Sequence, residues 1–162
     1  CPTASPSSLW YSTLFTLGYL NSNSKVLYCP SIDSPKTVPV PSLTGYIDYG
    51  INLHIASNFR YVTDDFCTPA KESQITNPAG TILLIDSYRA DLWPGQKLGY
   101  YIVRDVSSSA DYIAHARHNQ GLNVLWVDGH VTHIKIKDPT NPWAELGEGN
   151  DFGASGNFWD RY

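Results

Sequence analysis

Several features that mark common functional classes are missing from this sequence. Only eleven of its 162 residues are Lys or Arg, the net charge is −4, and no stretch gathers the basic residues on one face, which argues against nucleic-acid binding. No run approaches the roughly 20 apolar residues of a membrane span. The three cysteines form no CxxC pair, so a structural zinc site would have to be assembled from distant residues.

Methionine is also absent, and the chain begins with Cys1. We therefore expect that a segment preceding this residue was removed. With 42% hydrophobic residues, a chain of this length can bury about 70% of its unfolded surface, which predicts a single domain over 1–162, with residues 1–8 flexible. The low charged fraction of 16% and the eleven tyrosines indicate a secreted or surface domain rather than a cytosolic enzyme.

The cysteines suggest a disulfide in a chain of this kind. Cys1 lies at the terminus, so we expect Cys29 to pair with Cys67 while Cys1 stays unpaired. Such a cross-link would stabilise the fold by roughly 3–4 kcal/mol through the entropy of the unfolded chain. The alternative is three free, buried thiols in a reducing compartment.

Hydrophobic periodicity predicts an α+β fold, with one helix followed by antiparallel strands. The helix is expected over 7–20, with a serine cap and an apolar face formed by Trp10, Leu14, Leu17 and Leu20. Strands are expected over 81–85, 97–105, Leu122–Val127 and Val131–Ile136. The last two flank Asp128 and Gly129, the Asp-Gly signal of a tight hairpin. The Gly- and Trp-rich tail should be an ordered loop pinned by Trp143, Phe158 and Trp159.

Histidines and aspartates that could bind a metal or form a polar network gather near this hairpin: His115, His118, His130, His133, Asp86, Asp111 and Asp128. Zinc would need three or four of them to converge. Positions 130 and 133 face opposite sides of a strand, so at most one of them can join His118. We favour a structural role without a transition metal, in which His118 and Asp128 bond each other or nearby backbone groups. Arg117 should pair with Asp86 or Asp111.

Four blocks carry a resemblance to a known family. They are "LYCPS" (27–31), "YGIN" (49–52), "NPAGTILLIDS" (77–87) and "RHNQGLNVLWVDGHV" (117–131), in which His118 is followed by nine residues and Asp128-Gly129. In this combination and order they resemble the bacterial prepilin-type proteins that share a processing-associated H-x9-DG domain. The resemblance extends from about Trp10 to the end of the chain.

This resemblance implies the globular head of a type IV pilin or type II secretion pseudopilin, with an N-terminal helix packed on an antiparallel sheet. It implies a non-enzymatic, extracytoplasmic subunit whose partners are other pilin or pseudopilin subunits or secretion-system components. Contact with the membrane would be made only through a long N-terminal helix. The cleavage site and that helix are missing here, and we take Cys1 as the point where the helix was trimmed away.

Two further expectations concern ligands. Major pseudopilins hold calcium in their C-terminal loop region, and the acidic tail of this chain offers Glu148, Asn150 and Asp151 as oxygen ligands. The alternative is a solvated acidic loop. The alternative function is a secreted carbohydrate-binding module, in which exposed Trp93, Trp143 and Trp159 would stack on sugar faces. No catalytic motif accompanies either reading.

Overall fold

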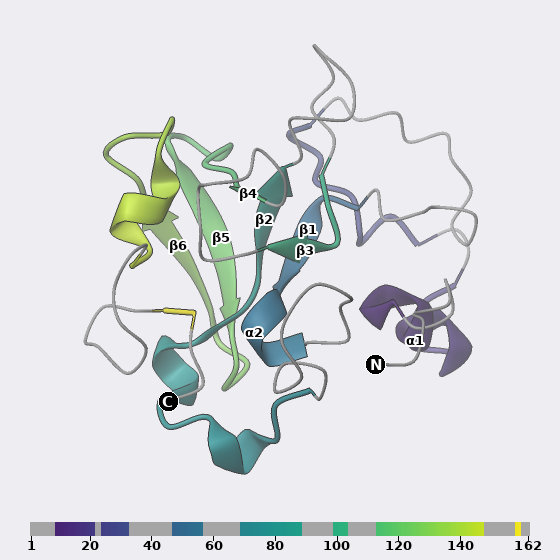
Figure 1. Ribbon diagram of the computed structural model, residues 1–162. Helices are drawn as coiled ribbons and strands as arrows, with labels where there is room; N and C mark the ends of the chain where they lie inside the picture. The colour runs from purple at the N-terminus through teal and green to yellow at the C-terminus, as the bar shows by residue number, and fades with distance from the viewer. Residues whose placement is uncertain are drawn as a thin grey trace.

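The computed structural model describes residues 9–21, 24–32, 47–56, 69–88, 99–103, 113–147 and 158–159, which form an α+β fold (Figure 1). Its elements are α1 (Trp10–Thr16), β1 (Tyr49–Asn52), α2 (Leu53–Ala56), β2 (Ile82–Tyr88), β3 (Ile102–Val103), β4 (Ile113–Ala114), β5 (Gly121–Trp126) and β6 (Val131–Lys135), with short 3-10 helices at Glu72–Gln74, Pro78–Gly80 and Pro142–Glu145. Residues 1–8, where flexibility was predicted, lie outside these ranges. Within them, no helix combines the length and the apolar character needed to cross a bilayer.

The strands form one mixed sheet in the order β3-β1-β2-β5-β6, with β4 paired to β2 outside this path. β2 is central and pairs antiparallel with β1, β4 and β5. β3 runs parallel to β1, so the prediction of a purely antiparallel sheet was wrong at this edge. β1 and β3 are separated in the chain by the whole of β2, and a connection of that kind, unlike a hairpin, allows parallel pairing.

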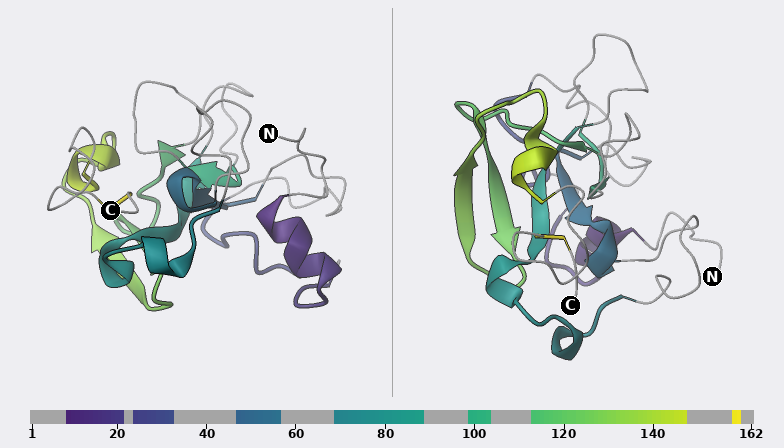
Figure 2. Two further views of the ribbon diagram at one scale, coloured as in Figure 1. Left: turned by 60° about the horizontal axis from the view of Figure 1, so that its bottom comes forward. Right: turned by 60° about the vertical axis from the view of Figure 1, so that its left-hand side comes forward.

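The first helix is shorter than predicted. α1 begins after Leu9, which makes no side-chain cap, and the chain leaves it through Gly18, whose φ of 77° is in the left-handed region that favours glycine. Leu17 is therefore outside the helix and 62% exposed, whereas Tyr11 is buried. Figure 1 and the left view of Figure 2 place α1 on the side of the sheet away from β5 and β6.

The hairpin predicted around Asp128 and Gly129 is confirmed. β5 and β6 pair antiparallel, with Leu125 opposite Val131 next to the turn and Gly121 opposite Lys135 at the far end. Gly129 has a φ of 93°, the positive value that the turn requires. β2 starts where expected but continues through Tyr88, so Asp86 lies within the strand rather than at its end.

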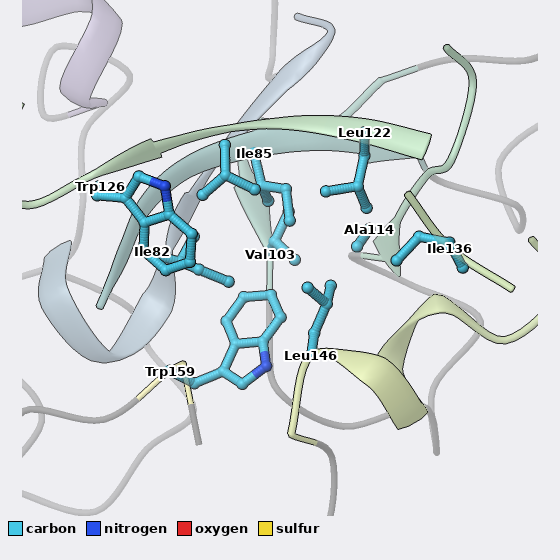
Figure 3. Packing of buried hydrophobic residues seen from close by; sticks show 10 residues of the cluster. Ile82, Ile85, Val103, Ala114, Leu122, Trp126, Ile136, Leu146 and Trp159 are labelled. Carbon is cyan, nitrogen blue, oxygen red and sulfur yellow. The ribbon is translucent and has the colours of Figure 1, made fainter. Parts of the chain in front are cut away.

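The larger hydrophobic core lies against the central strands. Figure 3 shows Trp159 and Leu146 from the C-terminal part of the chain facing strand residues such as Ile82 and Val103. Trp159 is fully buried and Phe158 packs against the cluster, so both residues lie in the core as anchors should, while residues 148–157 of the predicted loop lie outside the described ranges. The side chain of Trp143, the third predicted anchor, is outside the described part of the structure.

A second hydrophobic cluster joins α1 to the other edge of the sheet. Tyr11 of α1 packs in it with Leu27, Ile47, Tyr101 and Ile102. The Trp10 indole donates a 2.8 Å hydrogen bond to the Tyr101 carbonyl just before β3. The segment around residue 27 is thereby held beside β1, and this position brings Cys29 next to the centre of the sheet.

Candidate functional site

Largely buried polar side chains meet around Asp86 in a group that we call the Asp86 cluster: Cys29, Tyr49, Asp86, Arg117 and His118. Asp86 itself is fully buried in β2 and lies opposite Tyr49 of β1. Its Oδ2 accepts a 2.7 Å hydrogen bond from the backbone N–H of Asn123 in β5. A carboxylate inside a sheet needs such partners, because an unpaired buried charge is strongly disfavoured.

Arg117 supplies the opposite charge, as the sequence predicted. Its side chain is 2% exposed, and its Nε lies 3.9 Å from Asp86 Oδ1. Its Nη2 donates a hydrogen bond to the carbonyl of Ser87. Among the described residues, Arg117 Nε and Nη1 and Asp86 Oδ1 have no hydrogen-bond partner, so charge attraction between two buried side chains holds this pair. Asp111, the other predicted partner, lies outside the described residues.

A tight turn positions His118. The backbone N–H groups of His118 and Gly121 each donate a 2.9 Å hydrogen bond to the other residue's carbonyl. Between them, Asn119 and Gln120 have φ values of 48° and 60°. Consecutive positive φ values suit the two-residue turn of a hairpin, but they are uncommon outside glycine. Backbone strain of this kind often accompanies a functional constraint, and here it presents the imidazole to the Asp86 cluster.

The imidazole of His118 faces three polar groups. Its Nε2 lies 3.4 Å from Cys29 Sγ and 3.4 Å from Asp86 Oδ2, while Nδ1 lies 3.4 Å from Ser31 Oγ. The His118 side chain is 22% exposed and Asp86 is fully buried. A thiol, an imidazole and a carboxylate thus converge on one point at the edge of the core.

Cys29 is a free and fully buried cysteine, so the predicted disulfide with Cys67 was wrong for this structure. Its Sγ faces His118, and its backbone N–H donates a 2.7 Å hydrogen bond to Asp48 Oδ2. The sequence argument considered only the export-like composition and could not show that a histidine occupies the space beside the thiol. Cys1 and Cys67 lie outside the described residues.

Tyr49 makes the folding stability of the chain depend on pH in the alkaline range. Burial, followed by the charges of Cys29 and Asp86, raises the pKa of Tyr49 from 10.0 to about 12. The phenol therefore stays neutral in the folded chain at pH values where it ionises in the unfolded chain. This contribution to stability is complete below the unfolded pKa and is lost as the pH rises through the folded pKa.

We expect the melting temperature of the wild type to fall more steeply than that of Tyr49→Phe as the pH rises from 10.0 towards about 12. Circular dichroism melts at a series of alkaline pH values measure both slopes. Tyr19→Phe is the matched control, because Tyr19 is 74% exposed, and its slope should equal that of the wild type. Parallel curves for Tyr49→Phe and the wild type would contradict the assignment.

Asp128 lies at the opposite end of β5 from His118, so the predicted contact between these two residues was wrong. Its Oδ1 accepts a 3.1 Å hydrogen bond from the backbone N–H of His130 and lies 2.5 Å from Nδ1 of the same residue. These bonds, first to the side chain and then to the backbone, lower the pKa of Asp128. The alternative expectation, that Asp128 bonds nearby backbone, is confirmed.

The remaining histidines do not join His118. His130 stacks on Trp126, His115 stacks on Tyr88, and His133 Nδ1 lies 3.4 Å from Asn123 Oδ1. Within the described ranges, the group of three or more potential metal-binding side chains is Cys29, Asp86 and His118. The predicted collection of histidines is therefore replaced by one histidine with two partners from distant segments.

The predicted calcium ligands, Glu148, Asn150 and Asp151, lie outside the described residues. Nearby, Glu145 Oε1 accepts backbone hydrogen bonds from Lys137 and Asp138 at 2.6 and 3.3 Å. This acidic side chain therefore organises the loop after β6.

The tryptophans proposed to stack on sugars are only partly described. Trp159 is fully buried and cannot present its ring face to a glycan in this conformation. Trp93 and the Trp143 side chain lie outside the described part. The structure therefore removes one of the three residues on which a carbohydrate-binding surface would depend.

No protein-family model matches the chain, and neither the curated proteins nor the solved structures yield a match to it. The geometry therefore has to be interpreted from its own residues. Sequence reasoning selected Asp86, Arg117 and His118 but missed Cys29 and Tyr49 as members of the same cluster. A signal was available, since both stand in the quoted blocks "LYCPS" and "YGIN".

Proposed function

We propose that this chain is the globular head of a pilin-like subunit of the cell envelope, with a structural rather than a catalytic role. One observation carries the proposal: the four sequence blocks behind the resemblance converge on the Asp86 cluster. "LYCPS" supplies Cys29, "YGIN" supplies Tyr49, "NPAGTILLIDS" supplies Asp86, and the H-x9-DG block supplies Arg117 and His118.

The contacts made by these blocks join separate parts of the chain. Asn52 of "YGIN" is fully buried. Its Nδ2 donates 2.9 Å hydrogen bonds to the carbonyls of Ile82 and Trp159, so it ties the C-terminal segment to the start of β2. Buried, satisfied polar networks of this kind specify a single packing arrangement, which suits a head that must keep its shape in an assembly.

Exposed apolar side chains near α1 support a subunit role. Leu17, Tyr19 and Val26 are each more than half exposed and come from one stretch of the chain that includes the end of α1. We propose that these exposed side chains form part of a surface that contacts another protein. In the proposed assembly, this side of the head faces a neighbouring subunit.

The test is to isolate the protein from the membrane and sheared-filament fractions of its source cells and determine its N-terminus by mass spectrometry. We expect a processed N-terminal residue followed by a long apolar helix, together with co-sedimentation with filaments. Recovery only as a freely secreted protein without such a helix would overturn the proposal. Binding on a glycan array would instead favour the carbohydrate-binding alternative.

A second arm locates the contact between subunits. Tyr19→Cys and Val131→Cys are introduced separately into the full-length protein, in a background with Cys1→Ser and Cys67→Ser. Both positions are exposed, at 74% and 66%, but Val131 lies at the hairpin on the other side of the sheet. We expect oxidative cross-links between subunits from Tyr19→Cys and markedly fewer from the matched control, Val131→Cys.

A further inference from the structure

We propose that Cys29, Asp86 and His118 form a binding site for a zinc-like divalent transition metal. Each of these residues offers one ligand atom, and the thiol sulfur, carboxylate oxygen and imidazole nitrogen lie within 4.8 Å of one another. The inference is independent of the proposed pilin-like role, because it depends only on the geometry of the Asp86 cluster.

The arrangement around His118 favours a metal site over a catalytic triad. In a triad, the nucleophile and the carboxylate contact opposite nitrogens of the imidazole ring. Here Cys29 Sγ and Asp86 Oδ2 both lie 3.4 Å from the same nitrogen, Nε2, and Nδ1 faces Ser31. Three donor atoms that face a common point are what a metal ion requires.

The donor set selects the class of ion. Thiolate and imidazole ligands suit zinc and related transition metals, whereas calcium and magnesium take oxygen ligands. Three protein ligands leave one position of a tetrahedral zinc site for water. Of the three side chains, Cys29 and Asp86 are fully buried and His118 is 22% exposed, so solvent reaches the site on the histidine side.

Metal binding changes the charges of the Asp86 cluster. Asp86 is already opposed by Arg117, and metal binding requires Cys29 to lose its proton to solvent. The resulting thiolate and the Asp86 carboxylate together supply two negative charges that offset a divalent cation, while solvent on the His118 side stabilises the remaining positive charge of Arg117. The backbone N–H of Asn123 donates a hydrogen bond to Asp86 Oδ2, and Ser31 Oγ lies beside His118 Nδ1, the ring nitrogen that does not face Cys29; such outer partners orient metal ligands.

The experiment uses a protein carrying Cys1→Ser and Cys67→Ser, which leaves Cys29 as the single cysteine. The protein is stripped with EDTA and titrated with Co²⁺. We expect the near-ultraviolet sulfur-to-cobalt charge-transfer band and intense visible bands of a tetrahedral site, both abolished by added Zn²⁺. Elemental analysis after dialysis should give about one zinc per chain, as for a single three-ligand site.

Three variants in the same background assign the ligands. Cys29→Ser should lose the charge-transfer band, and His118→Gln should weaken Co²⁺ binding by at least about tenfold. His133→Gln is the matched control for adventitious binding, because His133 is an exposed histidine on β6, and it should bind like the parent. Absence of the charge-transfer band in the single-cysteine parent would overturn the proposal without relying on any variant that fails to fold. Unchanged affinity in His118→Gln would overturn it as well.

Discussion

Asp86→Ala is expected to lower the free energy of unfolding by about 3–5 kcal/mol, the range found when one member of a buried ion pair is removed. The substitution leaves the Arg117 guanidinium, which is 2% exposed, without its counter-charge. It also removes the acceptor for the backbone N–H of Asn123. Urea or guanidinium unfolding in the presence of EDTA measures the effect with no contribution from bound metal.

Two controls separate charge from general disruption. Asp138→Ala removes an exposed carboxylate that accepts hydrogen bonds from its sequence neighbours Thr140 and Asn141, so it should destabilise the protein much less than Asp86→Ala, because it leaves no buried charge unpaired. The double variant Asp86→Ala with Arg117→Met should be more stable than Asp86→Ala alone, because it no longer buries an unpaired cation. If the double variant is the less stable of the two, the charge argument fails.

Trp159→Ala is expected to lower the free energy of unfolding by about 3–5 kcal/mol, the usual cost of removing a large aromatic ring from a core. Trp159 is fully buried in the larger cluster with Ile82 and Leu146 (Figure 3). Its carbonyl accepts a hydrogen bond from Asn52 Nδ2. The loss should therefore affect the whole cooperative transition rather than only the C-terminal segment.

Chemical denaturation monitored by far-ultraviolet circular dichroism measures this change. Val131→Ala is the matched control, since Val131 is 66% exposed, and it should shift the midpoint only slightly. A Trp159→Ala protein with the stability of the wild type would show that the tail does not belong to the core. It would also reopen the possibility that Trp159 serves a surface function.

Whether a contact could be predicted from the sequence depends on how many residues separate its two partners along the chain. The β5–β6 hairpin was predicted because its turn residues, Asp128 and Gly129, lie next to the strands that they join. The pairing of Arg117 with Asp86 was also predicted, as one of two partners. In contrast, β3 spans only Ile102–Val103 and pairs with β1, from which the whole of β2 separates it in the sequence. No local sequence pattern indicates this pairing.

The Asp86 cluster could be predicted only in part for the same reason. His118 was selected from the sequence as part of a polar network near the hairpin, but its partner Cys29 lies 89 residues away in the sequence. Nothing local to Cys29 distinguishes a thiol beside a histidine from one half of a disulfide. Only the packing of the segment around Leu27 beside β1, through the second hydrophobic cluster, decides between these alternatives.

The unequal separation of these contacts along the chain has a kinetic consequence. The β5–β6 hairpin joins near neighbours in sequence and can form in about 1–10 μs, whereas the contact between Cys29 and His118 spans 89 residues and that between Asn52 and Trp159 spans 107. Closing such long loops costs entropy before their contacts compensate for it. We therefore expect the hairpin to belong to the folding nucleus and the Asp86 cluster to form after the transition state. Interactions that form after the transition state mainly control the unfolding rate, so this cluster determines how long a folded molecule persists rather than how fast it folds.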